Sequence, residues 1–146
     1  MCRRCERCGD AVTPVEAWSA VVSGEDAAVY AYSVAGARVS DAARRRALAG
    51  LDAHRANRSR AAALVVSAGG TPPAAEAAYE LPGDVSTRSG ARAVLASVDN
   101  ALVGVYADAA SAASGDDRRW AARTAAECAV RAVAWGATPQ AFPTAT

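Results

Sequence analysis

Residues 24–39 read GEDAAVYAYSVAGARV and carry the pattern that decides the fold. Apolar and small residues recur there at spacings of three and four, which places them on one face of an amphipathic α-helix. The same face extends upstream through Val22 and Trp18, and it includes Glu25, where a buried charge is costly. The stretch therefore predicts a bundle helix with a carboxylate in its buried face.

The composition indicates one helical domain. The chain has 146 residues, which is enough for a single core, and it is rich in Ala, which favours helix. Its net charge of +1 gives no strong attraction for nucleic acid or acidic lipid. Charged residues or Asn interrupt every long apolar segment, and the basic N-terminus lacks the apolar region of a signal peptide. We therefore expect a cytoplasmic protein with no membrane segment.

Caps and breaks divide residues 13–137 into four predicted helices. A capping box at Thr13 and Glu16, with Pro14 at the first helical position, marks the first start. Ser, Thr, Asp and Gly residues mark the later starts and ends. The expected helices run from 14 to about 39, from 41 to about 68, from the cap at 86–87 to about 113, and from 116 to about 135.

The one long connection, residues 69–87, has a length that suits a crossover. Its ~17 residues could span about 50 Å, whereas a 28-residue helix is about 42 Å long. Tyr79 and Leu81 are the residues expected to hold it against the helices. Two antiparallel hairpins joined by this crossover predict an all-α, ferritin-like four-helix bundle with the second and third helices parallel.

The hairpins bring charged residues to matching depths in the bundle. In the first hairpin, Glu25 lies level with His54 and within one helical turn of Arg55 and Arg58. A buried carboxylate must pair, take up a proton or bind a metal, and a guanidinium can satisfy it with two hydrogen bonds. We expect a buried ion-pair network that fixes the helix register, with a ligand or metal site made of the same groups as the alternative.

The second hairpin repeats this arrangement. Asp99 lies level with Arg131, and Tyr106 follows Asp99 at the same seven-residue distance at which Tyr32 follows Glu25. Each hairpin therefore has an acid and a tyrosine on its first helix and a base on its second. The candidates for a polar core or ligand-binding site are Glu25, Tyr32, His54, Arg55, Arg58, Asp99, Tyr106, Glu127 and Arg131.

The cysteines suggest a second, separate candidate. Cys2, Cys5 and Cys8 form C-x-x-C-x-x-C, a spacing typical of zinc or iron–sulfur ligation, but no fourth ligand is evident in the sequence. A disordered Cys-rich tail over residues 1–12 is the favoured interpretation, with a partner-completed metal site as the alternative. Residues 138–146 are expected to form a frayed C-terminal tail, and Cys128 a buried small hydrophobe.

Three segments resemble an uncharacterised ferritin-like domain family of small, alanine-rich proteins from actinomycete-type bacteria. They are EDAAVYAYSVAGARVS at 25–40, HRANRSR at 54–60 and AAYELP at 77–82. The resemblance covers Trp18 to about Trp135 and implies a ferritin-like four-helix bundle without an established activity. Members of that family typically have His after the first acidic residue, where this chain has Asp26.

The wider superfamily suggests a test for a di-iron centre. Such a centre takes a Glu from each of two helices and a Glu-x-x-His motif from each of the other two. Glu25 and Asp99 match two carboxylate positions, but Leu51 stands three residues before His54, and the fourth helix has no His. A complete di-iron site is therefore not expected.

Two functions from different classes follow. The favoured one is a non-catalytic interaction or scaffold module without a cofactor. It is expected to form a dimer through Ala-rich faces, and an unknown protein partner is possible. The alternative is a metal- or small-ligand-binding protein or an oxidoreductase, with a degenerate site around Glu25 and one iron, manganese or zinc ion on Glu25, His54 and Asp99. Whether the protein is an enzyme stays open, with a non-enzyme favoured.

A third function, polyanion binding, has weaker support. Arginine is the only basic residue besides His54, and several arginines cluster in the second predicted helix. The near-neutral net charge and the lack of an aromatic platform argue against specific nucleic-acid binding. The residues in question are Arg44, Arg45, Arg46, Arg55 and Arg60.

Overall fold

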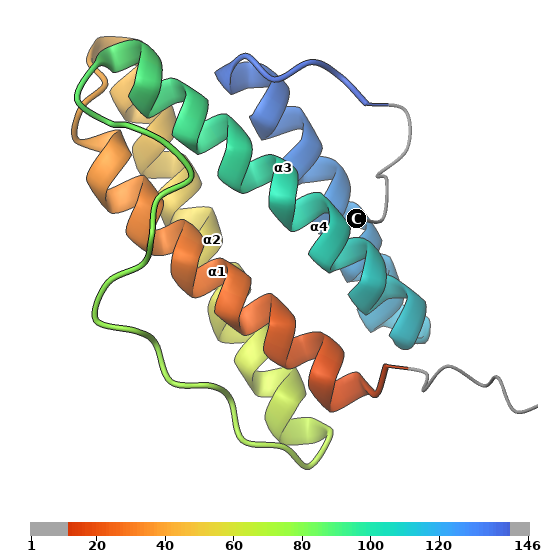
Figure 1. The fold of residues 1–146 in the computed structure, drawn as a ribbon. Helices are drawn as coiled ribbons and strands as arrows, with labels where there is room; N and C mark the ends of the chain where they lie inside the picture. The colour runs from red at the N-terminus through yellow and green to blue at the C-terminus, as the bar shows by residue number, and fades with distance from the viewer. Residues whose placement is uncertain (1–11, 141–146) are drawn as a thin grey trace, which may run out of the picture.

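The computed structural model describes residues 12–140 and contains four α-helices in this part of the chain. They are α1 (Pro14–Gly36), α2 (Asp41–Ser67), α3 (Arg88–Ala112) and α4 (Gly115–Trp135). The helices lie side by side, and α1 packs against both α2 and α3, while α3 packs against α4 (Figure 1). No strand occurs within residues 12–140, so the predicted all-α class with four helices is confirmed.

The helix ends follow the local signals in the sequence. The Thr13 side chain accepts a hydrogen bond from the Glu16 N–H, and the Glu16 carboxylate accepts one from the Thr13 N–H, which forms the capping box. At the other end of the chain, α4 stops at Gly136, whose φ of 115° is in the left-handed region that favours glycine. α1 ends at Gly36 rather than near Val39, because residues 37–39 form the turn into α2.

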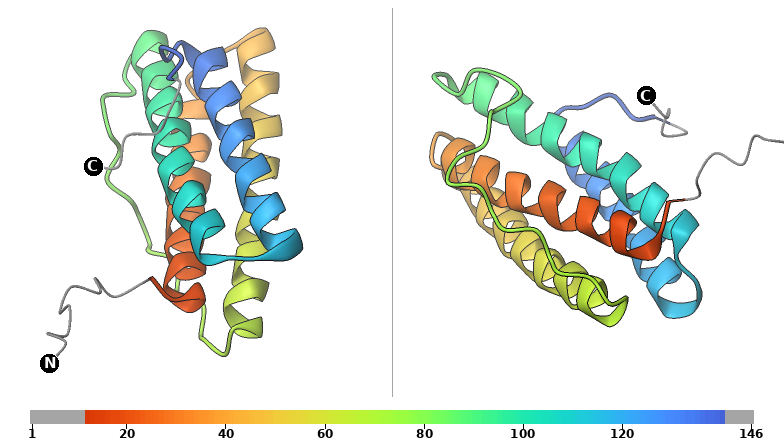
Figure 2. Two further views of the ribbon diagram at one scale, coloured as in Figure 1. Left: turned by 90° about the vertical axis from the view of Figure 1, so that its right-hand side faces the viewer. Right: turned by 60° about the horizontal axis from the view of Figure 1, so that its bottom comes forward.

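The connection between α2 and α3 runs along the outside of α1 from one end of the bundle to the other (Figures 1 and 2). The ring of Tyr79 lies 5.8 Å from the ring of Tyr30 on α1, measured between centroids. Leu81 and Val85 pack against the apolar core. Tyr79 and Leu81 therefore hold the connection against the helices as expected.

The two hairpins repeat each other with a constant offset. α3 begins 74 positions after α1 (88 minus 14), and α4 begins 74 positions after α2 (115 minus 41). The same offset relates three pairs of core residues, namely Glu25 and Asp99, Tyr32 and Tyr106, and His54 and Cys128. Cys128 thus occupies in the second hairpin the position that His54 occupies in the first.

The core consists of two apolar clusters on either side of a polar centre. One cluster includes Trp18, Leu102 and Trp120, and the other includes Leu51 and Trp135. Between them lie three ionisable side chains with no exposed surface: Glu25, His54 and Asp99. The bundle therefore encloses charge at mid-length, where an ordinary bundle is apolar.

α3 has a long apolar segment. By length and composition alone it could cross a membrane, with a mean hydropathy of 1.2 over an 18-residue window, of which 39% is buried in the bundle. Asp99 interrupts this window and is fully buried. The polar middle of α3 thus faces the other helices, and the expectation of no membrane segment stays a prediction.

Gly50 offers a test of the packing between α1 and α2. A Cβ at this position would lie 2.4 Å from Cε1 of Tyr32, so Gly50→Ala forces the Tyr32 ring to move. Overpacking of this kind costs about 1–3 kcal/mol of unfolding free energy, which chemical denaturation measures.

The control is the same substitution in a Tyr32→Leu background, where the clashing atom is absent. There Gly50→Ala is expected to be neutral or to stabilise by up to about 1 kcal/mol, since it replaces a helical glycine. An equal loss of stability in both backgrounds would contradict the packing described here.

Candidate functional site

Glu25 connects three helices at the centre of the bundle. The Tyr106 hydroxyl of α3 donates a hydrogen bond to Oε1 of Glu25 at 2.5 Å, and His54 Nδ1 of α2 lies 2.7 Å from Oε2. Both carboxylate oxygens therefore have a partner, as a buried carboxylate requires. His54 was predicted to lie level with Glu25, and it is His54, instead of the predicted guanidinium groups of Arg55 and Arg58, that contacts the carboxylate.

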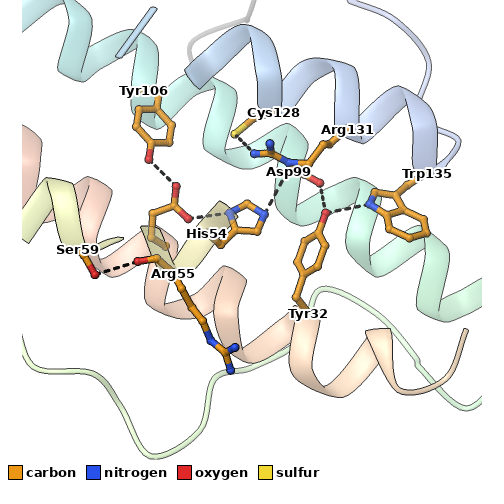
Figure 3. Close-up of polar contacts among 10 residues, drawn as sticks. Tyr32, His54, Arg55, Ser59, Asp99, Tyr106, Cys128, Arg131 and Trp135 are labelled. Atoms are coloured by element: carbon orange, nitrogen blue, oxygen red, sulfur yellow. Dashed lines mark hydrogen bonds and ion pairs between the residues drawn. The ribbon is translucent and has the colours of Figure 1, made fainter. Parts of the chain in front are cut away.

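Asp99 occupies the equivalent place on α3 and receives its donors from α1 and α4 (Figure 3). The Tyr32 hydroxyl donates to Oδ2, and Arg131 Nε donates to Oδ1 at 3.0 Å. The indole N–H of Trp135 donates to the Tyr32 oxygen at 2.9 Å, so this hydroxyl both donates and accepts. Asp99 and Arg131 were predicted to lie level, and the structure brings them into contact.

Each of the two tyrosines binds the acid of the other hairpin. Tyr32 lies on the same helix as Glu25 but binds Asp99, and Tyr106 lies on the same helix as Asp99 but binds Glu25. For each tyrosine, burial raises the pKa above its ordinary value, and the charge of the bound carboxylate adds to this effect. Both hydroxyls are therefore neutral donors at physiological pH.

His54 lies between the two acids, with Nδ1 toward Glu25 and Nε2 toward the labelled Asp99 (Figure 3). Its Nε2 is 3.5 Å from Oδ1 of Asp99, which is an ion-pair separation rather than a well-formed hydrogen bond. Among the buried side-chain nitrogen and oxygen atoms of residues 12–140, this Nε2 is the one without a hydrogen-bond partner. The ring is further fixed by Tyr32, whose ring centroid is 4.7 Å away.

The two carboxylates keep His54 charged. Burial on its own lowers the pKa of His54, but the contacts with the Asp99 and Glu25 carboxylates and their charges outweigh it, and the pKa is raised above its ordinary value. The network therefore favours the His54 imidazolium, which together with the Arg131 guanidinium faces the two acidic side chains.

Cys128 lies beside this network as a neutral thiol. It has no exposed surface, and Arg131 Nη2 approaches its Sγ at 3.2 Å. Burial raises the pKa of the Cys128 thiol to about 12, with the opposing effect of Arg131 too small to prevent it. A thiol in this state is not a nucleophile, which agrees with its expected role as a small buried hydrophobe.

Two arginines predicted for the polar core lie outside it. The Arg55 side chain is 59% exposed and lies 3.5 Å from Asp52, one turn away on the same helix. Arg58 contacts Asp26 rather than Glu25, with Nε to Oδ1 at 3.0 Å and Nη2 to Oδ2 at 3.4 Å. Arg58 is one turn beyond His54, and its long side chain extends to Asp26, the neighbour of Glu25. Arg55 lies outside because of helix rotation: α2 turns His54 inward and so directs the next residue about 100° away from the core.

The prediction for Glu127 is wrong for the same reason. Glu127 is exposed, and the inward position of α4 is occupied by the next residue, Cys128. The offset of 74 positions from His54 points to Cys128 and could have corrected the choice. Trp135 was also missed, although it follows Cys128 by seven residues and therefore lies on the same face of α4. Cys2, Cys5 and Cys8 lie outside the described residues, so their role stays a prediction.

The comparisons with known proteins identify the family. Residues 17–146 match the family described as domain of unknown function (DUF4439). The chain belongs to this family. No match is found among curated proteins. A crystal structure of a conserved hypothetical protein, rv2844, from Mycobacterium tuberculosis is similar to this DUF4439 chain, with 26% identity and a TM-score of 0.79 over 89% of this chain and 92% of the other.

The arrangement of this DUF4439 core does not fit a resident metal ion. Within residues 12–140, no group of three or more His, Cys, Asp or Glu side chains is placed to hold one. The oxygens of Glu25 and Asp99 are already engaged by donors, and Arg131 adds a positive charge where a metal would need a ligand. The chemistry of the donors is that of a closed ion-pair network.

The pH dependence of stability tests the charge on His54. A pKa raised in the folded state gives stabilisation that is complete below the unfolded value of about 6.5 and is lost as the pH rises toward the folded value. We expect the unfolding free energy to fall between pH 6.5 and 8 by up to about 1.4 kcal/mol per pH unit.

Denaturant titrations at a series of pH values measure this slope. His54 is the only histidine, so His54→Gln is expected to remove the dependence in this window as well as lowering the stability. The pH series stops at 8, because above this pH the ionisation of the Cys128 thiol in the unfolded chain also begins to change the unfolding free energy. A stability that is constant or rises from pH 6.5 to 8 would show that His54 is not held in its charged form.

Proposed function

We propose that this DUF4439 protein is a non-catalytic, ferritin-like interaction module whose polar core holds the helices in register and whose outer surface binds other protein chains. One observation carries the proposal. All four oxygens of the two core carboxylates are engaged, those of Glu25 by Tyr106 and His54 and those of Asp99 by Tyr32 and Arg131. A network satisfied in this way offers no open position for a substrate or metal.

The ferritin-like assignment is supported by connectivity. The bundle consists of two helical hairpins related by a constant offset, with one connection along its whole length between α2 and α3. Ferritin-like bundles have one such crossover. The carboxylates Glu25 and Asp99 stand where that fold would carry ligands, and we infer that ion pairs have replaced the metal.

The protonation states of the core argue against acid–base or nucleophilic catalysis. His54 carries a proton on each ring nitrogen when it is charged, so it cannot act as a base. Tyr32, Tyr106 and Cys128 are buried, and burial raises the pKa of each. A catalytic group needs a pKa near the working pH and access to its substrate.

The arginines of α2, with the exception of Arg45, have partners within the protein, which argues against a polyanion-binding surface. Arg46 donates to the carbonyl oxygen of Ala134 at 3.1 Å, and the Arg60 guanidinium lies 4.3 Å from the Trp120 ring centroid. These contacts extend from α2 to α4 and so have a structural role. With a net charge of +1, we propose a cytoplasmic protein without specific nucleic-acid or membrane binding.

One observation supports the alternative, a single iron, manganese or zinc ion or a small ligand at Glu25, His54 and Asp99. The Nε2 of His54 lacks a well-formed hydrogen bond, which leaves one group in the core free to take another partner. Binding there would require Arg131 to release Asp99 and His54 to lose a proton. The alternative is therefore the weaker of the two.

A metal-binding measurement separates these functions. In the full chain with Cys2, Cys5 and Cys8 all replaced by Ser, equilibrium dialysis against Fe(II), Mn(II) or Zn(II) is expected to show far less than one ion per chain. Removing the three cysteines ensures that any bound ion belongs to the core.

Stability measurements on two Glu→Ala variants complete the test. Glu25→Ala leaves a buried imidazolium without one partner and is expected to cost about 3–5 kcal/mol of unfolding free energy. Glu127→Ala, the matched exposed carboxylate, is expected to change it by less than about 0.5 kcal/mol. One bound ion per chain that Glu25→Ala removes without loss of stability would overturn the proposed function.

A further inference from the structure

An apolar groove lies on the outer face of α3 and α4, apart from the polar core. It encloses about 640 Å³ and is lined by residues of α3, of α4 and of the segment 137–140. None of the lining residues carries a charge. An uncharged apolar surface of this kind is typical of the centre of a protein–protein interface.

Large apolar side chains are exposed in this groove. Val130 is 70% exposed and Val133 is 42% exposed, and both belong to α4. On the α3 side, Gly104 lies in the lining, and a Cβ added there would meet no atom within 4 Å. The hydropathy of α3 also indicates an exposed apolar surface, since only 39% of its most apolar 18-residue window is buried. The groove thus combines an apolar ridge on α4 with the small residues Ala101 and Gly104 on α3, where another helix can approach closely.

Two exposed charges of opposite sign lie along the same face. Asp108 lies on α3 one helical turn beyond Gly104, and Arg123 lies on α4 two turns before Val130. Neither forms an ion pair within residues 12–140. The Asp99–Arg131 contact shows how α3 and α4 are aligned, and by this alignment Asp108 and Arg123 lie at nearly the same level.

These features make the face complementary to itself. A two-fold axis parallel to the helices places α3 of one copy against α4 of the other, antiparallel and at the same level. The Val130 and Val133 ridge of each copy then meets the flat α3 surface of the other. Asp108 of each copy meets Arg123 of the other, so the two charges outside the apolar region are paired twice.

We propose that the groove between α3 and α4 is the contact surface of a homodimer. The proposal rests on the proposed function, in that the outer surface and not the core does the binding, and it names the partner as a second copy of this chain. α3 carries the small residues and α4 carries the exposed valines. The charge pair between Asp108 and Arg123 fixes the level at which the copies join.

Sedimentation velocity of the full chain, from low micromolar to several hundred micromolar, tests the dimer. The wild type is expected to sediment as a dimer at the upper concentrations, and Val130→Arg as a monomer. The matched control is Val66→Arg, since Val66 is 60% exposed on α2 and lies outside the groove. This control is expected to keep the dimer, and thermal melts confirm that both variants are folded.

Charge reversal tests the geometry independently of the valines. Asp108→Arg and Arg123→Asp are each expected to raise the dimer dissociation constant about tenfold, because each places like charges together twice. The double variant restores opposite charges and is expected to return the dissociation constant to near the wild-type value.

Several results would overturn the proposal. They are a wild type that is monomeric at every concentration, equal effects of Val66→Arg and Val130→Arg, and a double charge variant no tighter than the single ones. A monomeric wild type that dimerises when residues 141–146 are removed would also overturn it, because the chain's own end would then occupy the groove. The two proposals can be overturned separately. A metal ion bound in the core would overturn the proposed function whether or not the protein is a dimer, and a monomeric wild type would overturn the dimer even if the core binds no metal.

Discussion

His54 lies between Glu25 and Asp99 in a part of the bundle from which solvent is excluded, so the charges there must balance one another. An isolated carboxylate in such a place would cost several kcal/mol, and two would also repel each other. The imidazolium between them and Arg131 at the edge cancel both charges. Because each group comes from a different helix, the balance exists only when all four helices are in register.

This constraint explains how the two hairpins are held together. α2 packs on α1 and α4 packs on α3, while α1 and α3 form the contact between hairpins. Across that contact, each hairpin gives its tyrosine to the acid of the other. α2 and α4 are connected through side chains, by Arg46 over the Trp135 ring and by Arg60 over the Trp120 ring. Sliding one hairpin along the other would break both tyrosine bonds at once.

The sequence predicts which core residues lie at the same depth in each hairpin, because the short turn between two helices determines this depth. Counting from the turns pairs Glu25 with His54 and Asp99 with Arg131, because a short hairpin fixes the depth of each residue. It does not fix rotation about the helix axis, which directs Arg55 and Glu127 away from the core. It also does not fix which acid a long side chain reaches, and Arg58 contacts Asp26 instead of Glu25. The tyrosine exchange depends on the packing of α1 against α3, which no turn determines, so it could not be predicted.

The proposed function assigns the activity of this DUF4439 protein to its outer surface, because the core is closed by its own ion pairs. That conclusion depends on the charge state of His54, which nitrogen NMR of the ring measures directly in protein labelled with ¹⁵N-histidine. The account predicts that at pH 7 both Nδ1 and Nε2 carry a proton and show the chemical shifts of an imidazolium. A neutral ring with one unprotonated nitrogen at pH 7 would contradict it, because the core would then hold an unbalanced negative charge and a free metal ligand.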